Sequence, residues 1–397
     1  MRIALTTSGG DAPGLNAVLC SATRTARSLD HEIFGIRNGF AGLLDNNELI
    51  PLDERAVEGI DRTGGTILGA AASGVPFGAQ GGVVAQLVRA LKRFEIDALI
   101  MVGGDGTMRI AHEVADAGMC VVGVPKTIDR DVVGTFSTFG FDTAVSTATE
   151  AIDRLHTTAA SHSRLMVVEV MGRDAGWIAL YAGNGGGAAA IALPEFPYNI
   201  DVFASHIRRR EAAGKHYHIL VCAEGARPAG GEVTLHGRTG RLGGVAEYLA
   251  AKLQEATGKE SRALSLGHLL RGGPPVTSDR LLGLRFGSAA VGALERGLTD
   301  CMVAYQPPGF TELPLADVAG RTSCLTPETP ELGTASGLGI SLGTSVNSGV
   351  WKVACKGKGG AAWAHAGNGC THRRHPSTWR PRSQAGHPRT SRLCAAV

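Results

Sequence analysis

Short apolar runs that end in paired glycines are the feature of this sequence that most restricts its fold. In the two clearest cases, Gly9 and Gly10 follow the run at residues 3–7, and Gly103 and Gly104 follow the run at residues 96–102. Stretches between the runs, such as 144–155 and 245–255, have helical apolar spacing. Strands that alternate with helices predict mostly parallel sheets with helices on both faces. We therefore expect an α/β fold, built as one large unit or as two lobes.

Composition excludes several classes of protein. The chain has 397 residues, 44% of them hydrophobic. No apolar run reaches the roughly 18 to 20 residues of a membrane span, and the first residues read as a strand, not as a secretory signal. Eight cysteines without a CxxC pair indicate neither a zinc site nor a disulfide framework, and favour a reducing, cytoplasmic setting. The net charge of +3 conceals a basic tail on a nearly neutral body, so we expect no nucleic-acid and no membrane partner.

The residues that follow each apolar run are the candidate site, because open parallel sheets bind ligands beyond the carboxyl ends of their strands. Residues 8–14 (SGGDAPG) open a helix, where glycines and free N–H groups suit a phosphate. A tight turn without a ligand is the alternative. Residues 103–107 (GGDGT) include Asp105, a natural magnesium ligand. The alternative role for Asp105 is to cap the following helix.

A third apolar run ends in the charged segment 125–131 (PKTIDRD). Asp129 and Asp131 stand two positions apart, so they face the same side of an extended loop that also carries Lys126 and Thr127. In-line phosphoryl transfer requires a carboxylate that accepts the hydroxyl proton, a metal and cationic groups. We therefore predict that Asp129 is the catalytic base. A charged loop that is merely solvated is the alternative.

Separate charged residues occur at further strand ends, and together they suit a dianionic substrate such as a sugar phosphate. They are Arg164, Arg173, Glu224, Arg262, His268 and Arg271. The sequence contains no GxxxxGK[ST] phosphate loop and no GxGxxG dinucleotide fingerprint. It also lacks GxSxG, HExxH and the HRD set of protein kinases.

Taken in order, these segments make the chain resemble the 6-phosphofructokinase family. The matching segments are SGGDAPGLNA at 8–17, GGTILG at 64–69, GGDGT at 103–107, PKTIDRD at 125–131, SHSR at 161–164, VVEVMGRDAGWIAL at 167–180 and LGHLLRGGPPVTSDR at 266–280. The resemblance covers residues 1–343 and implies the phosphofructokinase fold, two Rossmann-like lobes with mostly parallel sheets flanked by helices and the active site between them. Residues 344–397 have no counterpart and are expected to form a disordered extension, although a shifted reading frame would also explain their composition.

The resemblance implies a phosphotransferase with an alcohol acceptor. Such an enzyme uses ATP and Mg²⁺ to phosphorylate the 1-hydroxyl of fructose 6-phosphate, the committed step of glycolysis. The catalytic residues would be Asp129, Thr127 and Lys126, with Asp105 as the magnesium ligand. Thr127 would contact the sugar or the transferring phosphate.

The resemblance also implies which residues bind each reactant. The donor site would be lined by Gly10, Gly104, Asp105, Gly106 and Thr107. Fructose 6-phosphate would be bound by Thr127, Asp129, Met171, Gly172, Arg173, Glu224, His268 and Arg271. Arg164 and Arg262 would reach the sugar phosphate held by a neighbouring subunit, which implies a homodimer or homotetramer with shared active sites.

Two residues bear on the identity of the phosphoryl donor. Gly106 leaves space where pyrophosphate-using relatives carry an Asp that would crowd and repel the nucleotide α-phosphate. Lys126 points the other way, because pyrophosphate users also have Lys there. The combination resembles the mixed-substrate branch of the family, and we favour ATP over pyrophosphate.

The sequence departs from the family pattern at three positions. Ala72 stands where an Arg normally meets the transferring phosphate, and its loss could slow the reaction on the order of a hundredfold. Arg130 replaces an Asn between the two acids and is expected to point away, but its charge could lower the pKa of the base. Cys20 replaces an Arg of the effector site, which makes allosteric control doubtful. A weakly active phosphofructokinase-like subunit therefore stays an alternative.

Overall fold

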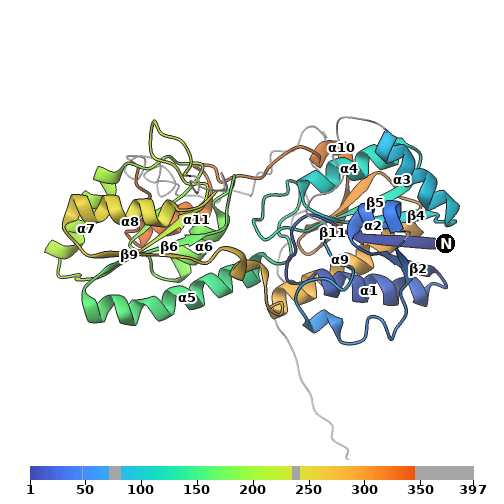
Figure 1. The fold of residues 1–397 in the computed structure, drawn as a ribbon, viewed down its shortest axis with the longest axis horizontal. Coiled ribbons are helices and arrows are strands. Elements are labelled where there is room, and N and C mark those ends of the chain that lie inside the picture. Colours follow the sequence, from blue (N-terminus) through green and yellow to red (C-terminus); the bar gives the residue numbers. More distant parts are fainter. Residues whose placement is uncertain (47, 71–81, 235–241, 345–397) are drawn as a thin grey trace, which may run out of the picture. The chain divides into compact units, whose positions relative to one another are not determined.

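The chain forms two β-sheets, each covered by helices on both faces (Figure 1). The structure is a computed structural model and describes residues 1–46, 48–70, 82–234 and 242–344. Ala72 and the predicted tail after Thr344 lie outside these residues. The α/β prediction is confirmed, and the three apolar runs that defined it are strands β1, β4 and β5.

The first sheet has seven strands in the order β11-β10-β5-β4-β1-β2-β3. The strands are β1 (Arg2–Thr7), β2 (Glu32–Ile36), β3 (Leu49–Pro51), β4 (Ala98–Gly103), β5 (Cys120–Pro125), β10 (Cys301–Gln306) and β11 (Gly309–Pro314). Strands β10, β5, β4, β1 and β2 are parallel to one another, and the two edge strands are antiparallel to their neighbours. The carboxyl ends of β1, β4 and β5, each followed by a predicted site segment, therefore meet at one edge.

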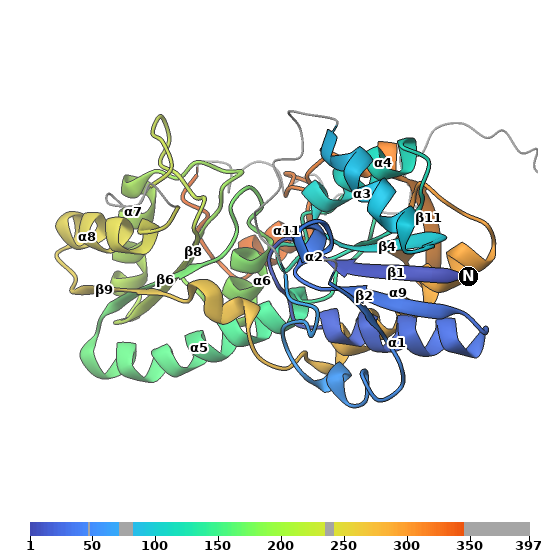
Figure 2. The same cartoon turned by 45° about the vertical axis from the view of Figure 1, so that its right-hand side comes forward.

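Alternating side chains on the strands of the first sheet build its two cores. Ile3 and Leu5 face α1 (Leu15–Ser28) and α9 (Thr277–Glu295), which lie side by side in both ribbon views (Figures 1 and 2). Ala4 faces the other side, which is covered by α2 (Gly39–Asn46), α3 (Gly82–Arg93), α4 (Asp105–Asp116) and α10 (Leu315–Val318). Helix α1 begins after Gly14, whose φ of +107° and whose Cβ position, 2.9 Å from the Phe139 ring, together require glycine.

The second sheet has four parallel strands in the order β7-β8-β6-β9. They are β6 (Leu165–Val170), β7 (Ala190–Ala192), β8 (His218–Ala223) and β9 (Ser261–Ser265). One face packs on α5 (Phe141–His162), α6 (Trp177–Gly185) and α11 (Pro330–Gly337), and the other on α7 (Ile200–Ala212) and α8 (Val245–Thr257). Short 3₁₀ helices, η1 (Ile60–Arg62) and η2 (Gly267–Arg271), complete the elements.

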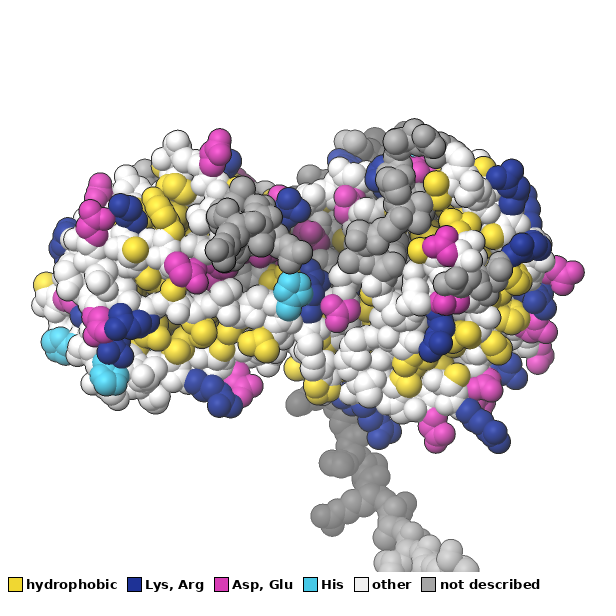
Figure 3. Space-filling view, viewed as in Figure 1, with side chains coloured by type: hydrophobic (Ala, Val, Ile, Leu, Met, Phe, Trp, Pro, Cys, Tyr) yellow, Lys and Arg dark blue, Asp and Glu magenta, His cyan; other side chains and the backbone are white. Residues whose placement is uncertain are grey.

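The chain passes between the two sheets more than once. After β9 it returns to the first sheet through α9, β10 and β11, and then runs back to place α11 against α6 of the second sheet. The sequence did not reveal this return, because a strand's pattern does not say which sheet it joins. In the described part of the chain, no helix combines the length and hydropathy needed to cross a membrane. Basic and acidic side chains are interspersed over the face drawn in Figure 3.

Candidate active site

The glycine loop after β1 is held by two cations from elsewhere in the chain. Lys126 Nζ donates a hydrogen bond to the carbonyl of Gly10. Arg271 Nη1 donates to the carbonyl of Asp11 at 3.1 Å, and a Cβ on Gly10 would lie only 2.6 Å from that nitrogen. Arg271, which η2 contributes, therefore packs directly against Gly10, and a larger residue here would displace its guanidinium. The loop therefore brings positive charge from two other segments to the carboxyl end of β1.

The loop after β4 places Asp105 at the first position of α4. Gly104 is the N-cap residue, and no side chain caps this helix. The alternative that Asp105 serves only as a helix cap is therefore wrong. Its Oδ1 instead accepts a hydrogen bond of 2.6 Å from the backbone N–H of Gly320. No sequence pattern indicates this contact, because Gly320 is distant from Asp105 in the sequence.

Two further contacts join the loop after β4 to its neighbours. The Thr107 hydroxyl lies 2.9 Å from the Ser8 hydroxyl, which ties the β4 loop to the β1 loop. The backbone N–H of Lys126 donates to the carbonyl of Gly103 at 2.8 Å. A Cβ placed on Gly106 would have no atom of the described residues within 4 Å. The exposed surface of this loop therefore has free space beside Gly106.

The charged segment after β5 is largely withdrawn from solvent. Lys126 is 4% exposed and Thr127 is 7% exposed. The backbone N–H of Asp129 donates to the Thr127 hydroxyl at 3.0 Å, while Asp129 Oδ1 is buried and accepts no hydrogen bond from any described residue. The alternative of a merely solvated loop is therefore wrong.

The surroundings of this segment shift the pKa values of Asp129 and Lys126 toward neutral pH. The pKa of Asp129 is raised to about 7, mainly by burial and then by the nearby charge of Asp131, while Arg271 opposes the shift. Burial also lowers the pKa of Lys126 to about 8, with repulsion from Arg271 acting in the same direction. A carboxyl group that is half ionised near neutral pH is well suited to accept a proton from an alcohol.

Arg130 is surrounded by aromatic side chains. Its guanidinium carbon lies 4.9 Å from the centre of the Trp177 ring. The pKa of Asp129 is raised, with burial as the largest cause, and Arg130 is not among the charges that act most strongly on this carboxyl. A lowering of this pKa by Arg130 stays a prediction.

Oxygen donors of the kind that magnesium prefers stand in the loops after β4 and β5. Asp105 has one carboxylate oxygen bound to a backbone N–H, and Asp129 has one buried oxygen without a partner among the described residues. Hard carboxylate oxygens at a strand end beside open space fit a hydrated Mg²⁺ that carries phosphate oxygens.

The carboxyl ends of β6 and β8 bring the predicted sugar-binding residues together. Met171 and Gly172 directly follow β6, and Glu224 directly follows β8. The backbone N–H of Gly225 donates to the carbonyl of Gly172 at 3.0 Å. Burial raises the pKa of Glu224, and the positive charge of Arg271 opposes this shift.

Two more predicted sugar ligands lie in these segments. Arg173 follows Gly172 and is exposed. His268 is exposed in η2, and its charge, like that of Arg271, lowers the pKa of Glu224. Arg271 acts on both Glu224 and Asp129, so the residues predicted to bind sugar and the predicted base share one electrostatic environment.

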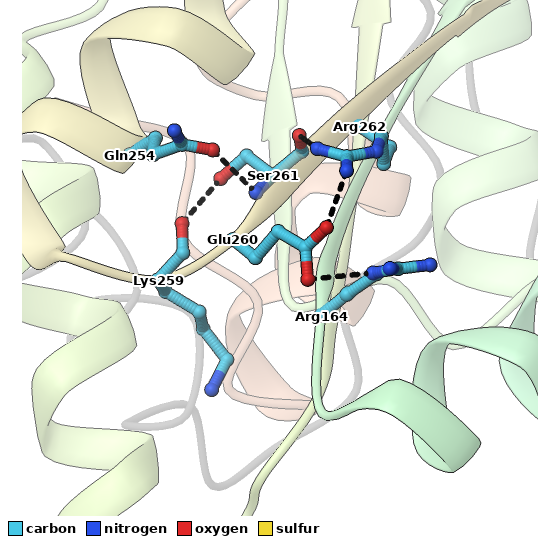
Figure 4. A network of polar contacts seen from close by, with 6 residues as sticks. All are labelled: Arg164, Gln254, Lys259, Glu260, Ser261 and Arg262. Carbon is cyan, nitrogen blue, oxygen red and sulfur yellow. Dashed lines mark hydrogen bonds and ion pairs between the residues drawn. The ribbon is translucent and has the colours of Figure 1, made fainter.

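Arg164 and Arg262 lie elsewhere. Arg164 directly precedes β6 and Arg262 is near the start of β9, so both lie at the amino ends of these strands. A strand of six residues spans roughly 20 Å, so these arginines are remote from Met171 in the same chain. Both form ion pairs with Glu260, and the Arg164 Nε–Glu260 Oε2 distance is 2.9 Å (Figure 4).

A second group of metal-ligating side chains lies on α4 and before β10. His112 Nδ1 is 2.9 Å from Asp300 Oδ1, and His112 Nε2 is 3.8 Å from Asp116 Oδ2. One nitrogen of His112 and one oxygen of each carboxylate lie within 4.8 Å of one another, and Asp116 in this group is exposed. The hydrogen bond to Asp300 raises the pKa of His112, so we interpret this group as an ion pair that joins α4 to the first sheet.

A comparison with known protein families decides which family this site belongs to. Residues 2–294 match the family described as Phosphofructokinase. The chain belongs to the phosphofructokinase family. The resemblance that the ordered motifs carried is therefore confirmed, and so is the fold that it implied.

Curated relatives of this phosphofructokinase family member divide by phosphoryl donor. It is 46% identical over 349 residues to the ATP-dependent 6-phosphofructokinase of Chloroflexus aggregans, covering 86% of this chain and 98% of that protein. It is also 46% identical over 338 residues to the pyrophosphate–fructose 6-phosphate 1-phosphotransferase of Amycolatopsis methanolica, covering 83% and 97%. Equal identity to both kinds means that the donor must be inferred from individual residues.

A solved structure agrees with the family assignment. The phosphofructokinase of Saccharomyces cerevisiae superposes with a TM-score of 0.71 and 31% sequence identity. The match covers 80% of this chain and 45% of the yeast chain, so the present chain spans about half of that larger protein.

Proposed function

We propose that this chain is an ATP-dependent 6-phosphofructokinase that phosphorylates the 1-hydroxyl of fructose 6-phosphate. The observation that carries the proposal is Asp129, whose buried and unpartnered carboxylate has a pKa of about 7 and follows β5 beside Lys126. A base with this pKa accepts the hydroxyl proton at neutral pH as the oxygen attacks the terminal phosphate.

The other residues take roles that follow from their surroundings. Lys126 is buried and cationic below its pKa of about 8, so it would stabilise charge that develops on the transferring phosphoryl group. Asp105 would hold Mg²⁺, which neutralises phosphate oxygens of the donor when it is bound. The N–H groups at the start of α4, with Gly104 and Thr107, would line the donor site together with Gly10.

The sugar would bind along the carboxyl ends of the second sheet. Glu224 is the acceptor for sugar hydroxyls, and Arg271 and His268 supply positive charge beside it. Met171, Gly172 and Arg173 would complete this surface after β6. Thr127 is buried beside Asp129 and would contact the sugar or the transferring phosphate.

We propose that Arg164 and Arg262 contact the sugar phosphate that a second copy of the chain binds. Their position at the amino ends of β6 and β9 keeps them from the sugar site of their own chain. Strand β9 is an edge strand, and its Leu264 is 37% exposed while Leu269 in η2 is 68% exposed. An apolar edge beside two arginines suits a homodimer, or a homotetramer built from such dimers.

The space beside Gly106 supports ATP as the donor. An added side chain there would meet no described residue, so it would project into the region where a nucleotide's α-phosphate would lie. We propose that pyrophosphate is the poorer donor, with pyrophosphate dependence as the second candidate because Lys126 is present. The proposed catalytic domain comprises residues 1–343, with 344–397 as an extension. Weak activity caused by Ala72 is the remaining alternative.

Gly106→Asp tests this donor assignment. We expect kcat/KM for ATP to fall about a hundredfold, because a carboxylate would crowd and repel the α-phosphate. Activity with pyrophosphate should be retained or gained. Gly309→Asp is a matched control, since a Cβ on Gly309 also has open space but Gly309 is the first residue of β11, outside the predicted donor site. Equal loss with both donors, or unchanged use of ATP, would refute the donor assignment.

A further inference from the structure

Arg130 occupies a cage of four aromatic rings directly beside the predicted base. Its guanidinium carbon lies 4.9 Å from the ring centre of Trp177, 5.3 Å from Tyr181, 5.4 Å from Phe136 and 5.5 Å from Phe141. Each ring presents a negative π face to a cation, so the cage binds the guanidinium from several sides.

Hydrogen bonds fix the guanidinium in this cage. Nη1 donates to the Tyr181 hydroxyl, which in turn donates to the Glu331 carboxylate on α11. Nη2 donates to the carbonyl of Phe136 at 3.0 Å. Arg130 lies on the loop after β5, whereas Tyr181 belongs to α6, so the side chain joins the catalytic segment to the helices of the second sheet.

The backbone of Arg130 is unusual as well. Its φ of +55° lies in the left-handed region, which costs free energy for any residue other than glycine and is tolerated best by Asn or Asp. An arginine holds this conformation only if its surroundings compensate, and the cage is the compensation that the structure offers.

A second connection runs from the same cage to the other acid. Trp177 Nε1 donates to the carbonyl of Ser323 at 3.0 Å, and the backbone N–H of Ser323 donates to the carbonyl of Asp131 at 2.7 Å. The loop is therefore held on both sides of Arg130, by Thr127 at the Asp129 backbone and by Ser323 at the Asp131 backbone.

The Asp129 carboxylate needs such support because its Oδ1 has no hydrogen-bond partner among the described residues. No hydrogen bond from a described residue fixes this oxygen, so its position depends on the backbone that carries Asp129 and on the packing around the side chain. We propose that Arg130 is a positioning residue, whose capture by the aromatic cage fixes the loop so that Asp129 faces the reacting hydroxyl. This inference rests on the proposed function, in which Asp129 is the base.

The same geometry excludes Arg130 as a substitute for the phosphate-binding Arg that Ala72 replaces in sequence. To reach a phosphate, its guanidinium would have to leave four aromatic rings and two hydrogen bonds. Arg130 therefore acts through Asp129 and not on the substrate.

Arg130→Met, Arg130→Lys and Tyr181→Phe in the full-length chain test this inference. We expect kcat of Arg130→Met to fall about tenfold or more while KM for fructose 6-phosphate changes by less than about threefold. Lys restores the charge but not the planar fork, so Arg130→Lys should recover part of this loss. Tyr181→Phe keeps the ring but removes the hydrogen bonds of the Tyr181 hydroxyl with Arg130 and Glu331, and it should lower kcat by a smaller factor.

Arg2→Met is the matched control. Arg2 also lies over an aromatic ring, 4.8 Å from the centre of Phe34, and donates to the Glu32 carboxylate at 2.8 Å and the Phe94 carbonyl at 3.3 Å, but it stands at the amino end of β1, at the opposite edge of the sheet from the loop after β5. We expect its kcat to stay within about twofold of the parent. A similar loss in this control, or an Arg130→Met kcat within twofold of the parent, would overturn the proposal.

A measurement without turnover separates this inference from the proposed function. Hydrogen exchange of peptides spanning 127–132, followed by mass spectrometry, should become faster in Arg130→Met and Tyr181→Phe but not in Arg2→Met. Unchanged exchange in both cage variants would refute the positioning role. If Arg130→Met does not fold, Tyr181→Phe decides the question by the same measurement. A parent protein without phosphofructokinase activity would refute the proposed function, while exchange would still report on the cage.

Discussion

The loop after β5 and the pair formed by Arg164 and Arg262 differ in how far their charges are shielded from water. Lys126 is 4% exposed, and the neighbouring Asp129 has a buried oxygen without a partner among the described residues. Arg164 and Arg262 instead share the carboxylate of Glu260, and the side chain of Arg262 is 53% exposed. Charges that are desolvated act strongly on a reacting group, whereas solvated ion pairs contribute little until a partner replaces the water.

Under the proposed function, the first region catalyses phosphoryl transfer and the second binds the sugar phosphate of a neighbouring subunit. Burial shifts the pKa values of Asp129 and Lys126 to about 7 and about 8. At the other region, the hydrogen bond from Arg164 lowers the pKa of Glu260, which keeps this carboxylate ionised. We therefore expect substitutions at β5 to act on kcat and substitutions at β9 to act on KM.

Asp129→Ser should have the largest effect. Loss of the general base is expected to lower kcat about a thousandfold or more, while fructose 6-phosphate still binds, because the sugar contacts lie on other strands. Steady-state kinetics and calorimetric titration with the sugar phosphate measure the two quantities. Turnover within tenfold of the parent would remove Asp129 as the base.

Lys126→Met should have the next largest effect, a fall in kcat of about a hundredfold, because a buried cation no longer stabilises the transferring phosphate. Lys259→Met is the control, since Lys259 is also a shielded lysine but pairs with Glu211 outside the site. Kinetics at saturating substrate compare the two variants. An equal fall in both would mean that loss of lysine packing, and not catalysis, explains the result.

The pH dependence of kcat provides the third prediction. Asp129 must be deprotonated to act as a base, so kcat should fall about tenfold for each unit of pH below its pKa of about 7. Lys126 must stay protonated, so kcat should also fall as pH rises above its pKa of about 8. A profile that is flat from pH 5 to pH 9 would contradict the role of burial in setting both values.

Glu260→Gln should act on the second region with a smaller effect. This substitution removes the negative charge that Arg164 and Arg262 share. KM for fructose 6-phosphate should therefore fall about threefold at low salt and return toward the parent value as salt is added. Glu255→Gln removes a similar exposed ion pair with Lys252 and should leave KM unchanged. A change in kcat without a change in KM would contradict the recognition role.

Removal of residues 351–397 should have the smallest effect of all. Their composition has no strand–helix pattern, and the family resemblance ends at residue 343. We expect the melting temperature and kcat of the truncated chain to match those of the parent, as measured by thermal denaturation and the same assay. A large loss of melting temperature would show that the tail belongs to the fold.

Local patterns in the sequence predicted the first region well. An apolar run followed by glycine is sufficient to define a strand and the loop that ends it, so β1, β4 and β5 and the positions of Asp105 and Asp129 were foreseen. The parallel arrangement then brought these loops to one edge of the sheet, as expected.

Contacts between distant segments could not be predicted in this way. The N–H of Gly320 that binds Asp105 and the aromatic cage of Arg130 both depend on how the chain passes between its two sheets. No periodicity encodes such a passage, because the interacting residues have ordinary neighbours in sequence. The left-handed backbone of Arg130 is also invisible in the sequence.

The most direct test of the account is an assay of the purified full-length chain with fructose 6-phosphate, Mg²⁺ and either ATP or pyrophosphate. We predict that fructose 1,6-bisphosphate forms with ATP, with a kcat/KM at least about tenfold higher than with pyrophosphate. Faster turnover with pyrophosphate would contradict the donor assignment based on Gly106. Formation of no bisphosphate with either donor would contradict the central claim that Asp129 and Lys126 form a working phosphoryl-transfer site.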